Sequence, residues 1–444
     1  MYWNIGVTRA NSNKLLLIIA IMLSALLLPS LEIRPFWPRV RLDDALIFGA
    51  FALNLLWQIT QRFHSSYDLE LTDHEGQSRG LRVVTKVFLL FLASIILSNL
   101  FAVMFLHGSI GIRDIMEVVT FAKYYLIITL ALALDLQEGE FAGLRKAFLV
   151  GFGIILVLSW SQFLNLANAN AWLTPFFAQS HLDNLVNANP PRVLGTFDNP
   201  NVMGIVSVLM LSLFVTWFYF QRNERTRALL LFVATGLTLK LTFMTISRTA
   251  LLATALVLTF LSLWAMIKFH WKKEVLLKVG ILLLLTLTIF FTSPRDFVSR
   301  MNEGTNFNTS TSAQGHMLRA GSALYYIHLS PILGWGTAKD TMTTLVDNEY
   351  ALITRRYGII GLAMYLWLFL RPAKAALQRG RLFNAYTYEP GMRENKSLLG
   401  VAFVATTLAL LVYNLTAGTI YNLQLMTLVA VFMGIIYRTE GESA

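Results

Sequence analysis

The chain has 444 residues, of which 56% are hydrophobic and only 14% are charged, with a net charge of +11 and no cysteine. Globular proteins carry about 45–50% apolar and about 25% charged residues, so much of this apolar surface must face lipid. The lack of cysteine excludes disulfides, cysteine-ligated metals and thiol nucleophiles. No Walker loop or H-E-x-x-H motif indicates a nucleotide or metal site. The composition therefore predicts an all-α polytopic membrane protein with no metal or other cofactor and no nucleic-acid partner.

The hydropathy pattern predicts about twelve transmembrane helices, because a helix needs about 20 mostly apolar residues to cross about 30 Å of hydrocarbon. The first of them follows Arg9 and Lys14 as a signal peptide would, but it lacks a small-x-small cleavage site, so we expect it to be retained. The predicted spans are 14–31, 42–60, 83–106, 115–136, 144–166, 201–220, 228–246, 248–269, 275–292, 350–370, 398–416 and 420–437.

Charge in the connections predicts the orientation. Most of the 36 lysines and arginines lie in alternate connections, which places both termini in the cytoplasm by the positive-inside rule. One large outer loop, 293–349, then separates nine spans in 1–292 from three in 350–444. Its polar stretch 302–315 we interpret as a mobile gate, and the helical spacing of apolar residues from His316 predicts a helix that ends at Ser330-Pro331.

The segment RVLGTFDNPN, from Arg192 to Asn201, leads directly into the sixth predicted span. Asn199 is a favourable N-cap and Pro200 a favourable first helical residue. The free N–H groups and partial positive charge of this helix start, next to Arg192, indicate an anion site. The alternative is an ordinary Asn-Pro helix start with a loop arginine.

Two further cations lie within or at the edge of predicted spans. Arg248 follows Ser247 at the start of the eighth span, and Lys123 lies about 12 Å inside the fourth. A cation inside the membrane costs at least about 2.5–3.5 kcal/mol on insertion scales, so it indicates a function or a partner. For Arg248 the alternative is snorkelling to the headgroups. For Lys123 the candidate partners are Glu117 and a bound phosphate.

The large loop adds Arg319, on the predicted amphipathic helix, and Asp347, at the start of the tenth span. A solvated helix face and a simple helix cap are the alternatives. Even so, the predicted orientation puts Arg192, Arg248, Arg319 and Asp347 on the outer side together. Guanidinium groups bind phosphate oxygens well, and one carboxylate suffices to deprotonate a hydroxyl. The set favours metal-independent sugar transfer from a lipid-linked diphosphate, which departs already ionised.

Four segments together resemble the O-antigen ligase and polymerase superfamily of bacterial envelope glycosyltransferases. They are RVLGTFDNPN, SRTALL from Ser247, HMLRAGSALYYIHLSPILGWGT from His316 and DNEYALITRRYGIIGL from Asp347. The likeness covers roughly 190–365, and the layout of spans extends it. It implies a GT-C-like enzyme of the bacterial inner membrane, with a periplasmic active site and an undecaprenyl-diphosphate-linked oligosaccharide as substrate.

The resemblance also implies roles for individual residues. Arg192, Arg248 and Arg319 would bind the diphosphate, and Asp347 would act as the base, with His316 as the second candidate because it lies one helical turn before Arg319. Further candidates for substrate contact are Asn199, Asn201, Lys123, Asn348 and Tyr350.

Ligases of the family usually carry His-Asn-x-Tyr where this chain has Asp347-Asn348-Glu349-Tyr350. The Asp-Asn form looks more like the polymerases, which join one lipid-linked glycan to the next repeat unit with inversion. That branch implies a chain-length regulator and a flippase of the same pathway as partners. A ligase acting on lipid A-core or another acceptor is the alternative. A lipid-linked oligosaccharide flippase is an alternative of another class, although it would be expected to show repeat symmetry and charges along a midplane path.

Overall fold

The computed structural model describes residues 3–28, 41–64, 75–134, 138–173, 192–197, 199–221, 225–293, 311–339, 346–382 and 392–441, and these contain helices but no strand. A helix coincides with each predicted span. These helices are α1 (Trp3–Leu27), α2 (Leu42–His64), α3 (Glu75–Phe105), α4 (Ile112–Leu132), α5 (Glu138–Leu164), α8 (Pro200–Phe220), α9 (Arg225–Met244), α10 (Arg248–Lys268), α11 (Lys273–Phe291), α14 (Glu349–Leu382), α15 (Met392–Tyr413) and α16 (Leu423–Gly441). The connections hold η1 (Leu166–Asn168), α6 (Ala169–Leu173) and α13 (Thr311–Leu329).

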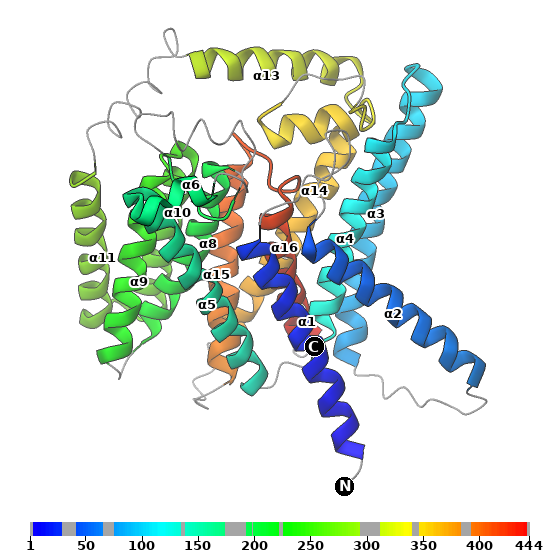
Figure 1. Ribbon diagram of the computed structural model, residues 1–444. Coiled ribbons are helices and arrows are strands. Elements are labelled where there is room, and N and C mark those ends of the chain that lie inside the picture. The colour runs from blue at the N-terminus through cyan, green and yellow to red at the C-terminus, as the bar shows by residue number, and fades with distance from the viewer. Residues whose placement is uncertain are drawn as a thin grey trace.

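Eight of the described helices are long and apolar enough to cross a membrane, and α1, α15 and α16 contain shorter apolar stretches. The all-α polytopic architecture is therefore confirmed, whereas the number of twelve spans stays a prediction. The start of α1 and the end of α16 lie toward one end of the bundle, and α13 lies across the opposite end (Figure 1).

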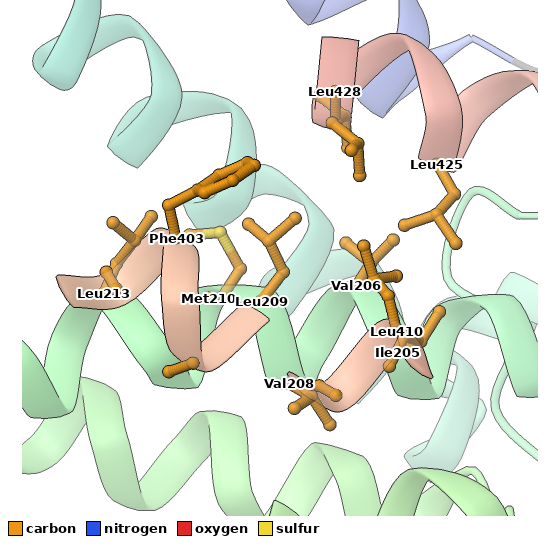
Figure 2. Close-up of a cluster of buried hydrophobic side chains, with 14 of the residues drawn as sticks. Ile205, Val206, Val208, Leu209, Met210, Leu213, Phe403, Leu410, Leu425 and Leu428 are labelled. Carbon is orange, nitrogen blue, oxygen red and sulfur yellow. The ribbon is translucent and has the colours of Figure 1, made fainter. Parts of the chain in front are cut away.

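Helix α8 forms the centre of one half of the bundle. In the most apolar stretch of α8, 94% of the residues are buried, compared with 17% in that of α11 at the edge of the bundle. A helix that is apolar all round is expected to be enclosed by other helices. Figure 2 shows its side chains Val206 and Leu209 gathered with Phe403 and Leu410 of α15 and with Leu425 of α16. Lipid is as apolar as these side chains, so burying them gives no hydrophobic driving force within the membrane. Close van der Waals packing between the side chains therefore holds the helices together.

The long helix α14 is broken at Gly358, where φ is +66° and ψ is −170°. Lipid cannot satisfy the backbone groups that a break exposes, so protein must do so. The turn after α13 supplies three hydrogen bonds at the break: Trp335 N–H to the Arg355 carbonyl (2.9 Å), Gly336 N–H to the Arg356 carbonyl (2.8 Å) and Ile359 N–H to the Pro331 carbonyl (2.9 Å).

The same turn is also fixed to α3. The N–H of Gly336 lies 3.0 Å from Ser98 Oγ, and the N–H of Thr337 donates to Asn99 Oδ1 over 2.8 Å. The turn therefore joins the outer loop firmly to the bundle. The helix end at Ser330-Pro331 is confirmed, but 311–315 of the expected gate are helical in α13; residues 302–310 lie outside the described part.

We expect Gly358→Ala to destabilise the protein by about 1–3 kcal/mol or more, because its φ is unfavourable for an L side chain. A Cβ there would also lie 1.9 Å from the Ile332 carbonyl oxygen. The matched control is Gly280→Ala in α11, where a Cβ meets nothing within 4 Å, and alanine should be neutral or stabilising. Thermal unfolding in detergent measures both, and equal melting temperatures would contradict the role assigned to the break.

Candidate functional site

The structure confirms the predicted start of α8 and shows what holds Arg192. Asn199 is the N-cap, and its side chain accepts from the Asn201 N–H over 2.8 Å. Buried Arg192 donates from Nε to the Thr245 carbonyl (2.9 Å) and from Nη2 to Asn201 Oδ1 (2.9 Å). Asn199 and Asn201 thus position the arginine. Since Thr245 lies just before α10, the Arg192 segment is joined to the turn that leads to Arg248.

Arg248 is the first residue of α10. Ser247 before it caps the helix, with its Oγ accepting from the Ala250 N–H over 3.3 Å. The Arg248 side chain is partly buried, and no hydrogen bond or ion pair satisfies it among the residues that the structure describes. A cation at the end of an apolar helix with no protein counter-charge is suited to bind an anion.

The outer loop brings Arg319 and Asp347 together. Arg319 Nη1 lies 2.5 Å from Asp347 Oδ2, and the two side chains are 44% and 27% exposed. The ion pair links α13 to the residues that precede α14. The predicted base therefore lies beside a predicted phosphate ligand and is open to solvent. The other candidate base, His316, lies on α13, but its side chain is outside the described part.

Two of the further candidates have structural partners. Asn348 Oδ1 accepts from the Ala351 N–H over 2.9 Å, as a helix cap does. The Tyr350 hydroxyl donates to the Leu411 carbonyl over 2.6 Å, which joins α14 to α15. Both contacts fit the interpretation of this segment as a helix start, and neither shows a role in substrate contact.

Residue Glu349 anchors the loop between α15 and α16. Its buried carboxylate accepts from the backbone N–H groups of Thr419 (2.5 Å) and Ile420 (2.9 Å). Its own N–H donates to the Asn414 carbonyl over 2.9 Å. Residues 414–422 therefore form a loop, which we call the α15–α16 loop, whose position depends on the start of α14.

The α15–α16 loop also reaches the start of α10. The hydroxyl of Thr416 forms a hydrogen bond with that of Thr249, the residue after Arg248. One loop thus contacts both the residue next to Arg248 and the residue two positions after Asp347. Together with the Thr245 contact of Arg192, this brings the four regions predicted from separate parts of the sequence to one end of the bundle.

Lys123 belongs to a different cluster. Its Nζ donates to Asp43 (3.0 Å) and Asp44 (2.6 Å) of α2. Arg41 Nε completes the group by donating to Asp43 over 2.8 Å. The expected partner Glu117 is not involved, and the pairing resembles a buried structural network in which two cations balance two carboxylates. We therefore leave Lys123 out of the candidate site.

Glu117 of α4 instead forms a second buried cluster that sequence reasoning missed. Its carboxylate accepts from Arg356 Nη1 (3.0 and 3.2 Å), Lys339 Nζ (2.8 Å), the Tyr421 hydroxyl (2.8 Å) and the Tyr357 hydroxyl. The Arg356 guanidinium also lies over the Tyr421 ring, 5.1 Å from its centre. The available signal was an acidic residue within an apolar span.

No protein-family model matches this chain, and no curated protein matches it. Among the described residues no group of three or more histidine or acidic side chains could hold a metal ion. The chemistry of the site follows from its residues: guanidinium groups for an anion, and an exposed carboxylate for a proton.

Lys123 and Arg248 should differ sharply in their effect on stability. We expect Lys123→Gln to destabilise the protein by about 3–5 kcal/mol, because it removes the cation that binds Asp44 and leaves buried Asp43 with Arg41 alone. Arg248→Gln should change stability by no more than about 0.5 kcal/mol, because it removes no interaction among the described residues. Thermal unfolding of both variants in the same detergent measures the difference. An equally large loss for Arg248→Gln would mean that Arg248 is structural.

Proposed function

We propose that the protein is a membrane glycosyltransferase of the O-antigen polymerase type. It transfers a glycan from undecaprenyl diphosphate to a lipid-linked repeat unit at the periplasmic face of the bacterial inner membrane. The observation that carries the proposal is Arg248, a partly buried cation with no partner among the described residues. Buried Arg192 binds the carbonyl of Thr245 in the turn that leads to Arg248, and the α15–α16 loop connects this helix start to the start of α14.

The donor fits this end of the bundle because its diphosphate lies at headgroup level while its prenyl chain lies in the bilayer. Arginine binds such oxygens bidentately, and the N–H groups at the starts of α8 and α10 favour negative charge. Arg192 is held in place by Thr245 and Asn201. Arg319, on the outer loop, would approach the diphosphate from the aqueous side.

The reaction needs one base and no general acid. Asp347 takes the proton of the acceptor hydroxyl as the oxygen forms a bond to the anomeric carbon. The bond from that carbon to the diphosphate breaks on the opposite side, which inverts the configuration. The arginines stabilise the departing diphosphate anion. Because Asp347 is paired with Arg319 at 2.5 Å, the base lies next to a ligand of the leaving group.

We expect purified wild-type protein in lipid nanodiscs to convert a lipid-linked repeat alone into a ladder of longer glycans. Gel separation of the lipid-linked products measures this directly. A ligase would give no ladder and would react only after addition of a second acceptor. A flippase would give no product at all but would move the lipid across vesicle membranes, and either result would contradict the proposal.

The roles of individual residues are tested by two variants in the same assay. We expect Asp347→Asn to lower turnover by about 10²–10⁴-fold with donor binding preserved, as for loss of a general base. Arg248→Lys should lower activity by at least about tenfold, because lysine keeps the charge but loses the planar fork. The matched control is Arg145→Lys in α5, where the arginine lies over Trp217 near the far end of α8, and it should retain activity. Full activity of both site variants would refute the assignment.

A further inference from the structure

Glu117 joins three elements that are separate in the sequence. It binds Lys339 in the segment after α13, Arg356 in α14 and Tyr421 in the α15–α16 loop. Its carboxylate is 1% exposed, so water cannot replace these partners. One buried charge thus holds the outer loop, the start of α14 and a second loop against α4.

Each of these elements leads to a residue of the candidate site. Lys339 lies between Arg319 and Asp347 along the chain, and its N–H is fixed by Asp114 Oδ1 at 3.0 Å. Tyr421 belongs to the loop whose Thr416 contacts Thr249, next to Arg248. The Glu117 cluster therefore has a connection to the proposed base and to the proposed phosphate ligand.

The start of α14, residues 349–357, links the position of Glu117 to that of Asp347. Because the helix is broken at Gly358, this short piece is not held by a continuous helix behind it. It is fixed near its first residue, where Glu349 binds the α15–α16 loop. Near its last residue, Arg356 and Tyr357 bind Glu117, and the turn after α13 donates to the backbone of α14. Asp347 lies just before this piece, so a shift at Glu117 moves the base.

We propose that Glu117 is a positioning residue that sets the separation between the Asp347 carboxylate and the Arg248 guanidinium. This rests on the proposed function. The physical reason is charge balance: Glu117 is the carboxylate that binds both Arg356 and Lys339. A neutral residue there leaves two cations facing each other at close range, so Lys339 and the Arg356 guanidinium move apart. The start of α14 and the turn after α13 stay joined by the backbone hydrogen bonds from Trp335 and Gly336, and they shift together relative to α4.

The effect of this shift falls on the chemical step. Arg192 is held by Thr245 and Asn201, and neither of these two bonds involves Glu117. Donor KM should then change by no more than about threefold, whereas a displacement of about 1 Å between reacting groups can lower kcat by about 100-fold. We expect Glu117→Gln to lower kcat by about 10–100-fold.

The matched control is Asp43→Asn. Asp43 is also a buried carboxylate with two cationic partners, Arg41 and Lys123, and these lie outside the α15–α16 loop. The substitution should lower the melting temperature as Glu117→Gln does while leaving kcat unchanged. A milder pair of variants keeps the test valid if Glu117→Gln fails to fold. The test variant is Tyr421→Phe, which removes one hydrogen bond to Glu117. Its control is Tyr219→Phe, which removes one hydrogen bond to Ser262.

A distance measurement makes the test independent of turnover. The chain has no cysteine, so spin labels can be attached to Leu252→Cys on α10 and Leu318→Cys on α13, which are 59% and 77% exposed. Pulsed electron paramagnetic resonance should show a shifted or broader distance distribution with Glu117→Gln or Tyr421→Phe, but not with the controls.

A shifted distance together with a lower kcat supports the proposal. An unchanged distance overturns it, as does a shifted distance with unchanged kcat, or an equal loss of kcat in the controls. If the wild-type protein makes no polymer, the proposed function fails, and the distance measurement alone decides whether Glu117 sets the spacing.

Discussion

Charged groups and broken backbone inside a bilayer must be satisfied by protein, because lipid offers them no partner. This constraint explains the main polar contacts in the bundle. Lys123 is balanced by Asp43 and Asp44, and Glu117 by Arg356 and Lys339. The break in α14 is closed by hydrogen bonds from the turn after α13. Arg248 lacks such compensation, since no contact among the described residues balances its charge.

Satisfying these groups also builds the site. The turn that closes the α14 break lies between Arg319 and Asp347 in the chain, so both are held near the end of the bundle. Glu349, which anchors the α15–α16 loop, follows Asp347 by two residues. The contacts that make the fold possible in lipid thus also bring together arginines and a carboxylate from distant parts of the sequence.

Much of this could be predicted from local pattern. Apolar runs of the right length indicated the helices, and an Asn-Pro pair and a Ser-Arg pair correctly indicated the starts of α8 and α10. Charge in the connections placed the candidate residues on one side. Each of these signals lies within a few residues of the feature it predicts.

The parts that were missed depend on contacts between distant residues. Glu117 pairs with Arg356, 239 positions later, and Lys123 with Asp43, 80 positions earlier. Glu117 lies close to Lys123 in the sequence whereas the two aspartates lie 80 and 79 positions away, so proximity along the chain favoured the wrong partner. The break at Gly358 depends on a turn that approaches from outside the helix.

The central claim is that Arg248 has no partner among the described residues because its partner is the diphosphate of the donor. A structure determined by electron cryomicroscopy with an undecaprenyl-diphosphate-linked glycan tests this most directly. Diphosphate oxygens within hydrogen-bond distance of the Arg248 guanidinium, with Arg192 beside them, are the predicted result. A diphosphate bound elsewhere, with Arg248 directed into lipid, would contradict the account.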